Sequence, residues 1–206
     1  MTGAELLLRE GAERILGAPL SPGETESFRR YLDVLEAWNR VHRLVGSSDR
    51  AWMVENLVLD SLLFLRVLPG SFESILDIGS GAGIPGIPIK IVRPQAALVM
   101  AESRRKRASF LASAVRAVGL TNARVFHGRA ESIELADPGF EVVVARCAGD
   151  PVSILDIGVA LAAPHGMVVV AGAPAWRHVP PGTEVARVTT PGGAPTRTFL
   201  IRRPKT

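Results

Sequence analysis

The residues in this sequence whose types and spacing could do chemistry are two carboxylates that flank a glycine-rich segment. Asp77 ends an apolar run, glycines recur through Gly79–Gly86, and Glu102 ends the next apolar run about 20 residues later. Glycines allow a backbone to approach a ligand closely. Carboxylates on both sides favour a ligand that carries positive charge and hydroxyl groups.

Two classes of ligand fit a loop of this kind. Gly81–Gly86 matches the dinucleotide pattern G-x-G-x-x-G, in which backbone N–H groups bind a pyrophosphate. Asp77 would repel that group, and Pro85 and Pro88 remove N–H donors. S-adenosylmethionine has no phosphate but carries a sulfonium and an amino cation, beside which Asp77 is favourable. We therefore expect this cofactor, with Glu102 accepting the ribose hydroxyls. A nicotinamide-dependent oxidoreductase is the alternative.

Apolar periodicity predicts the elements that position these residues. Helical spacing runs from Phe28 to Trp38 and from Val54 to Leu65, and after Pro69-Gly70 short apolar runs alternate with helical segments. The predicted strands are Ser74–Ile78, Ala97–Ala101, Ala123–Phe126, Glu141–Ala145 and Met167–Ala171, and the predicted helices between them are Gly86–Val92, Arg105–Val118 and Pro151–Ala162.

Alternation of apolar strands with helices is typical of a parallel sheet covered on both faces. We expect an α/β fold of the class I (Rossmann-like) methyltransferase type, with a doubly wound, mostly parallel sheet. A surface loop over Gly172–Gly182 and an antiparallel pair at Thr183–Thr189 and Thr196–Arg202 should end it. A helical N-terminal cap over residues 1–70 should precede the cofactor-binding body over residues 71–206.

Composition limits the other possibilities. The chain has 206 residues, a net charge of +4 and one cysteine, Cys147, which excludes an internal disulfide and fits a reducing cytoplasm. The histidines share no metal-ligand spacing and no apolar run is clean enough to span a membrane, so we expect neither a metal nor a membrane partner. The run Arg104–Arg107 opens a predicted helix, where cations oppose the helix dipole. RNA phosphate would compensate, although a solvated face explains the run equally well.

The segment DIGSGAGIPGIPIKIVRP, followed by ESRRKRASFL, resembles the RsmG family, also called glucose-inhibited division protein B. The resemblance extends over most of the chain through Trp38-Asn39, Asp60-Ser61-Leu62, Gly128–Glu131, Ala145-Arg146 and Arg197…Arg203. Members of this family are bacterial enzymes that methylate N7 of a guanine in the 530 loop of 16S ribosomal RNA. The resemblance implies a cytoplasmic methyltransferase, expected as a monomer, whose partner is 16S ribosomal RNA or the small ribosomal subunit.

The resemblance also implies roles by position. Gly79 and Ile84 would line the cofactor pocket, Glu102 would hold the ribose, and Arg146 would lie where the methionine moiety meets the target base; an ion pair at the sheet end is the alternative for this arginine. Ala130 and Glu131 would frame the adenine. The expected cofactor-binding residues are Asp77, Gly79, Ser80, Gly81, Gly83, Ile84, Glu102, Ser103, Ala130, Glu131 and Arg146, and the expected RNA-binding residues are Arg104, Arg105, Lys106, Arg107 and Arg197.

Methylation at guanine N7 explains why no acid–base pair stands out. N7 carries an in-plane lone pair and no proton, so the reaction needs no general base. It needs an unstacked base held in line with the S–CH₃ bond. We therefore expect no catalytic base, with Arg146 as the candidate for substrate positioning.

Three positions depart from the family's pattern, all on the substrate side. Arg43-Leu44-Val45 replaces Asn-Leu-Thr, Leu57 replaces a histidine, and Ala171-Gly172 replaces Lys-Gly. A homologue that methylates another nucleotide, or an inactive RNA-binding module, therefore stays an alternative. Cys147 also admits covalent catalysis at a pyrimidine carbon, although a lone cysteine is more often a small buried residue.

Overall fold

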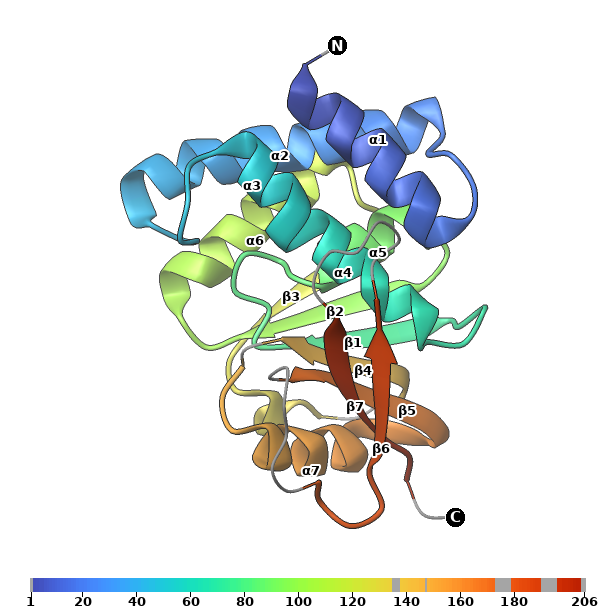
Figure 1. Ribbon diagram of the computed structural model, residues 1–206. Helices are drawn as coiled ribbons and strands as arrows, with labels where there is room; N and C mark the ends of the chain where they lie inside the picture. The colour runs from blue at the N-terminus through green and yellow to red at the C-terminus, as the bar shows by residue number, and fades with distance from the viewer. Residues whose placement is uncertain (1, 135–137, 147, 173–178, 190–195, 205–206) are drawn as a thin grey trace.

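A computed structural model describes residues 2–134, 138–146, 148–172, 179–189 and 196–204 and shows one seven-stranded sheet between two unequal layers of helices (Figure 1). The strands are β1 (Ser74–Ile78), β2 (Ala97–Glu102), β3 (Ala123–His127), β4 (Phe140–Arg146), β5 (Ala162–Gly172), β6 (Glu184–Val188) and β7 (Arg197–Arg202). Their order is β3-β2-β1-β4-β5-β7-β6. The first five are parallel neighbours and β7 is antiparallel to both β5 and β6. The expected fold class is therefore confirmed.

The helices fall into an N-terminal group and a group that connects the strands. The first group is α1 (Gly3–Leu16), α2 (Pro22–His42), α3 (Arg50–Met53), the π-helix η1 (Val54–Leu59), α4 (Asp60–Leu62) and the 3₁₀-helix η2 (Leu63–Arg66). The second is α5 (Gly86–Val92), α6 (Arg105–Val118), the 3₁₀-helix η3 (Ala130–Ser132) and α7 (Pro151–Leu161).

Local sequence signals fix where the first two helices begin. Thr2 accepts a hydrogen bond from the N–H of Glu5, whose carboxylate bonds back to the N–H of Thr2. Ser21 and Glu24 form the same reciprocal pair at the start of α2. These capping boxes satisfy N–H groups that have no partner inside the helix. The two boxes therefore mark where α1 and α2 begin.

The expected helix from Val54 to Leu65 is one helical region with three different periods. It passes from the π-helix η1 into the short α4 and then into the 3₁₀-helix η2. Tertiary packing overrides helix propensity here, since Leu57, Val58 and Leu62 are all buried in the core. A π turn re-aims the residues that follow it, and the next residue is Asp60.

The two faces of the sheet have separate apolar cores. The larger core joins the N-terminal helices to α5, α6 and one face of the sheet, through residues such as Phe28, Leu62 and Phe110. The smaller core joins the other face to α7, through residues such as Leu155. Figure 1 shows these layers, with α7 below the sheet. Because the first core is continuous across residue 70, the expected division into cap and body stays an organisational proposal.

The C-terminal part of the chain follows the expectations in outline. β5 begins directly after α7 and is longer than the expected Met167–Ala171. Residues 173–178 of the expected loop and residues 190–195 of the expected turn lie outside the described residues. Within the described part of the chain, no helix combines the length and apolarity needed to cross a membrane.

Candidate functional site

A cavity of about 360 Å³ lies at the carboxyl ends of β1 and β2 and beside the start of α7. This is the edge of an open α/β sheet where ligands bind. Its lining residues are Ile78, Gly79, Ala101, Ser103, Gly128, Arg129, Ala130, Glu131, Ala148, Gly149, Asp150, Ser153, Ile154 and Ile157. The fold therefore brings four of the expected cofactor residues together around one cavity: Gly79, Ser103, Ala130 and Glu131.

The glycine loop turns sharply as it leaves β1. Gly79 and Gly81 have φ angles of 69° and 55°, values that side chains other than glycine rarely adopt. The N–H of Gly79 donates to the carbonyl of Ala101 at 2.9 Å, which ties the loop to the end of β2. A Cβ on Gly79 would lie 2.7 Å from the Cβ of Ala148. The loop therefore packs directly against the chain that follows β4, and this contact leaves no room for a larger residue.

Glu102 is almost fully buried, with 4% of its surface exposed. Its carboxylate accepts the N–H of Gly81 at 2.9 Å and the N–H of Arg104 at 2.8 Å. Each oxygen keeps further acceptor capacity, since an ionised carboxylate offers about four lone-pair sites. Glu102 thus fixes the glycine loop to the start of α6, beside the cavity residues Ala101 and Ser103. Its contact with a ribose stays a prediction.

Asp77 does not line the cavity, and its expected charge contact with the cofactor stays a prediction. Side chains of a strand alternate between faces, so Asp77 shares the cap-side face with Ile75, while Ile78 reaches the cavity. Asp77 is 0% exposed, and its Oδ2 accepts the N–H of Gly86 at 3.0 Å. Burial raises the pKa of Asp77 to about 7. The residue therefore secures the turn from the loop into α5.

Three other loop residues also belong to the core side. Ser80 is buried and donates its hydroxyl to the carbonyl of Asp77 at 2.9 Å. Gly83 allows close packing, since a Cβ there would lie 2.4 Å from a methyl of Ile87. Ile84 lies in the larger apolar core and is not among the residues that line the cavity, so its role in the cofactor pocket stays a prediction. These residues pack on the core side of the glycine loop and fix its conformation.

Tyr31 connects the N-terminal helices to the same loop. Its hydroxyl donates to the carbonyl of Ala82 at 2.7 Å, and the side chain is fully buried. Burial raises the pKa of Tyr31, so the hydroxyl stays a donor at physiological pH. The sequence analysis missed this contact because the two residues are 51 positions apart.

The wall formed by α7 was also missed. Ile154 and Ile157 line the cavity, and Asp150 caps the helix by accepting the N–H of Ser153 at 2.9 Å. The only available signal was the Asp150-Pro151 start of the helix after β4, which marks a helix boundary and not a ligand. Gly128 and Arg129, quoted for the resemblance without a role, also line the cavity.

Arg146 and Arg197, expected at the cofactor and at RNA respectively, both bind Asp60. Arg146 Nε lies 3.1 Å from Asp60 Oδ2, and Arg197 Nε donates to Asp60 Oδ1 at 2.5 Å. Arg146 is not among the residues that line the cavity. It ends β4 on the cap-side face, because Val144 and Arg146 alternate with Ala145 of the smaller core. The ion pair considered as an alternative for Arg146 is therefore present.

The basic run lies at the start of α6, close to the glycine loop. Arg104, Arg105 and Lys106 are exposed, and Arg107 is half-buried. A Cβ on Gly81 would lie 3.6 Å from Nη1 of Arg107, which places this guanidinium beside the loop. No side chain caps the N-terminus of α6. The run thus presents positive charge next to the cavity edge.

The positions that depart from the family's pattern lie in different parts of the structure. Arg43 ends α2 in a left-handed conformation, with φ of 48°. Leu57 is buried in the π-helix. Ala171 pairs in register with Arg146, so a change at Ala171 affects the neighbourhood of the Asp60 ion pairs. Cys147 lies outside the described residues.

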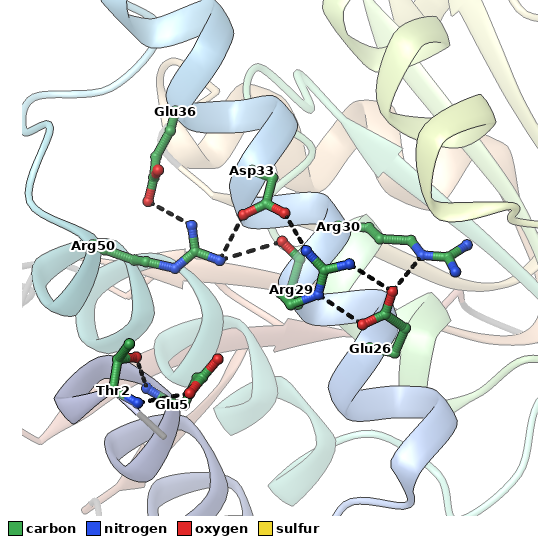
Figure 2. A network of polar contacts seen from close by, with 8 residues as sticks. All are labelled: Thr2, Glu5, Glu26, Arg29, Arg30, Asp33, Glu36 and Arg50. Carbon is green, nitrogen blue, oxygen red and sulfur yellow. Dashed lines mark hydrogen bonds and ion pairs between the residues drawn. The ribbon is translucent and has the colours of Figure 1, made fainter.

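A second cavity, of about 350 Å³, lies among α1, α2 and α3. Figure 2 shows the charged network at its rim, where Arg29 bridges Glu26 and Asp33, and Arg50 bridges Asp33 and Glu36. These arginines are engaged by neighbouring carboxylates and backbone, so they offer no surplus charge to a ligand. The cavity also lies away from the carboxyl edge of the sheet, and we assign it no catalytic role.

The carboxyl-edge cavity fits the adenosine part of S-adenosylmethionine. Ile78, Ala101, Ile154 and Ile157 provide apolar surface for a planar base. Ser103 and Glu131 provide polar groups on the β2 and β3 side. Small-molecule sites combine such apolar walls with a few polar groups that fix orientation. In the described part of the chain, no group of three or more histidine, cysteine or carboxylate side chains is arranged to hold a metal.

Comparison with known proteins agrees with this geometry. The GidB family, described as rRNA small subunit methyltransferase G, matches residues 24–174. The protein of that name from Chloroflexus aggregans is 37% identical over 160 residues, which cover 73% of this chain and 67% of the relative. The one from Ralstonia nicotianae is 34% identical over 188 residues, covering 87% and 81%.

Solved structures support the fold. A SAM-dependent methyltransferase from Aquifex aeolicus has a TM-score of 0.57 at 16% identity, covering 80% of this chain and 97% of its own. TrmN from Thermus thermophilus has a TM-score of 0.51 at 22% identity, covering 69% and 48%. The family match spans every residue that lines the carboxyl-edge cavity. The chain therefore belongs to the rRNA small subunit methyltransferase G family.

Proposed function

We propose that this protein transfers the methyl group of S-adenosylmethionine to N7 of a guanine in the 530 loop of 16S ribosomal RNA. Family membership makes it an S-adenosylmethionine-dependent methyltransferase of small-subunit rRNA. The target atom and the loop are the finer part of the proposal. The observation that carries it is the cavity at the carboxyl ends of β1 and β2, which lies wholly within the family match.

In this proposal the cofactor's adenosine occupies the cavity. Ala130 and Glu131 border the adenine, and Glu102 accepts the ribose hydroxyls with the lone pairs that Gly81 and Arg104 leave free. When bound, the cofactor supplies an electrophilic methyl group on a sulfonium. The chain's contribution is to hold the cofactor and the base in line and to exclude water, because N7 has no proton to remove.

The proposed RNA contacts lie beside the cavity. Arg104, Arg105 and Lys106 are exposed at the start of α6 and would bind phosphates, which position an RNA without reading its sequence. The partner is 16S ribosomal RNA or the small ribosomal subunit, and we propose that the protein acts on it as a monomer in the cytoplasm.

Methylation of a different nucleotide is the second candidate function. Ala171 stands where the family has lysine, and it is the register partner of Arg146. A missing cation at this point would alter how the base is held. The nicotinamide alternative has no support in the family to which the chain belongs.

The test is to incubate the protein with S-adenosylmethionine labelled on the methyl group and with small ribosomal subunits that lack the modification. Mapping should place the label on N7 of one guanine in the 530 loop. Label on another guanine or on adenine would support the second candidate. Label on a pyrimidine, or on the protein alone, would rule out the guanine-N7 assignment and would favour covalent chemistry at Cys147.

A further inference from the structure

The buried carboxylate of Asp60 lies where three distant segments meet. Asp60 begins α4 immediately after the π-helix, Arg146 ends β4, and Arg197 begins β7. The carboxylate is 8% exposed and contacts Arg146 through Oδ2 and Arg197 through Oδ1. Since β7 is antiparallel to β5, its first residue lies at the same edge of the sheet as the last residue of β4. The ion-pair cluster therefore sits at the carboxyl edge, on the cap side.

The cluster and the cavity occupy opposite faces of the same edge. The cavity is bounded by α7 and residues of the smaller core, such as Ile154. Arg146 lies on the same face of β4 as Val144, which belongs to the larger core. Burial raises the pKa of Tyr31, and the positive charge of Arg146 lies close enough to oppose this rise. A ligand in the cavity and a base on the cap side would approach each other across the ends of β1 and β4.

We propose that Asp60 is a positioning residue that holds Arg146 and Arg197 in place at the side of the carboxyl edge where the target base enters. This inference rests on the proposed function. Arg146 and Arg197 carry long side chains with several rotatable bonds, and one shared carboxylate restricts both. Arg146 approaches Oδ2 of Asp60 through Nε, and Arg197 contacts Oδ1 through both Nε and Nη2.

The chemistry of guanine fits an arginine held in this way. Guanine presents two acceptors on one edge, O6 and N7. If Arg146 donates to O6, the base is fixed while the N7 lone pair stays free for the methyl group. Among the described residues, Nη1 of Arg146 is buried and has no hydrogen-bond partner. A buried donor of this kind gains a partner when a carbonyl oxygen arrives.

The test compares substitutions at Asp60 with a matched control at another carboxylate that pairs with an arginine of β7. Asp60→Asn removes the charge, and Asp60→Glu keeps it but displaces the two guanidinium groups by about one methylene. Asp156→Asn is the control, because Asp156 pairs with Arg202 at the other end of β7 and is 65% exposed. The measurements are the single-turnover rate of methyl transfer on unmodified small subunits, the affinity for S-adenosylhomocysteine, and the melting temperature.

We expect Asp60→Asn and Asp60→Glu to lower the transfer rate about tenfold or more, because a misplacement of about 1 Å at a reacting group can cost up to roughly 100-fold. The affinity for S-adenosylhomocysteine should stay within about threefold, and Asp156→Asn should keep the wild-type rate. If Asp60 only neutralised the arginines, Asp60→Glu would react at the wild-type rate. That result would overturn the proposal, as would a loss of cofactor affinity that parallels the loss of rate.

A measurement that needs no RNA separates this proposal from the proposed function. In protein labelled with ¹⁵N-arginine, the Nε–H signal of Arg197, which donates to Asp60, should exchange slowly with water in the wild type and fast in Asp60→Asn. Slow exchange in both proteins would refute the positioning role, whatever the substrate. If the wild type labels no guanine but the signal behaves as expected, the reaction assignment fails while the ordering of Arg197 by Asp60 holds. If Asp60→Asn does not fold, Asp60→Glu serves in the rate measurement.

Discussion

The carboxylate of Glu102 accepts two backbone N–H groups, from Gly81 and Arg104, so a change at this residue acts on the loop and on the ligand together. We expect Glu102→Ala to weaken S-adenosylhomocysteine binding by about tenfold or more, since it removes a charged acceptor and leaves two N–H groups without a partner. Glu102→Gln keeps one acceptor oxygen, so its affinity for S-adenosylhomocysteine should lie between those of Glu102→Ala and the wild type. Titration calorimetry measures each affinity.

Glu131→Gln is the matched comparison for Glu102, because Glu131 lines the cavity and is exposed, whereas Glu102 is buried beside it. It should weaken binding by a smaller factor than Glu102→Gln. Equal affinity of Glu102→Ala and wild type would show that the ribose does not bind at Glu102.

Asp77 gives the protein a specific dependence on pH. Its pKa is raised from 3.8 to about 7 in the folded chain, so between these values the folded state holds a proton that the unfolded state has released. Stability should therefore fall as pH rises from about 4 to about 7, by roughly 4 kcal/mol at most. Asp77→Asn removes this titration and should be more stable than the wild type at pH 8, with a smaller difference at pH 5.

Urea unfolding at pH 5 and pH 8, without cofactor, measures the effect. The amide oxygen of asparagine can still accept the N–H of Gly86, which bonds to Asp77 in the wild type. A constant difference between the two proteins at both pH values would mean that Asp77 is ionised throughout, and its structural role would then need another explanation.

The helix α6 carries positive charge at its N-terminus, where cations lower helix stability. Arg105 and Lys106 stand in its first turn, where cations oppose the helix dipole at a cost of about 0.3–1 kcal/mol each. Replacing both with glutamate should stabilise the protein slightly and weaken RNA binding strongly. The salt dependence of the affinity should also become shallower, because fewer phosphate contacts release counterions.

Arg116→Glu provides the control for this prediction. Arg116 is exposed in the last turn of the same helix, where a cation favours the dipole. Its substitution should destabilise the protein slightly and change RNA affinity little. If the double substitution in the first turn left RNA binding unchanged, the basic run would be a solvated face.

The whole molecule shares one large core between the N-terminal helices and the sheet. Trp38 of α2 packs edge-on against Phe110 of α6 with ring centroids 5.9 Å apart, and Tyr31 bonds to the glycine loop. A fragment of residues 71–206 would expose the apolar faces of α5 and α6. Exposing one large apolar side chain costs about 2 kcal/mol of burial free energy. Exposing several of them therefore costs more than the whole free energy of unfolding of an ordinary domain.

We therefore expect the fragment 71–206 to show no cooperative unfolding in urea and no binding of S-adenosylhomocysteine, as followed by circular dichroism and calorimetry. The full chain serves as the reference. A fragment that unfolds cooperatively and binds the ligand would show that the body is an independent domain and that the boundary near residue 70 separates two folding units.

Much of the fold could be predicted from periodicity and helix-start signals, because these depend on neighbouring residues. The five parallel strands, the capping box at Ser21 and the helix over Arg105–Val118 follow from local patterns. The same applies to the position of the site, since the edge at which β1 ends is determined by chain order. The inner division of Val54–Arg66 into π, α and 3₁₀ turns could not be predicted, because tertiary packing selects it.

The sequence by itself determined the fold class, the family and the edge of the sheet where the candidate site lies, since motifs such as the glycine loop are contiguous. Only the tertiary structure decided which side chains line the cavity at that edge. Asp77 led to the right cofactor, yet its carboxylate turns to the opposite face of the sheet and bonds to Gly86. Asp60 meets Arg197 across 137 residues of sequence. Contacts of that range depend on how strands are ordered and which face each residue takes, and no local spacing encodes either.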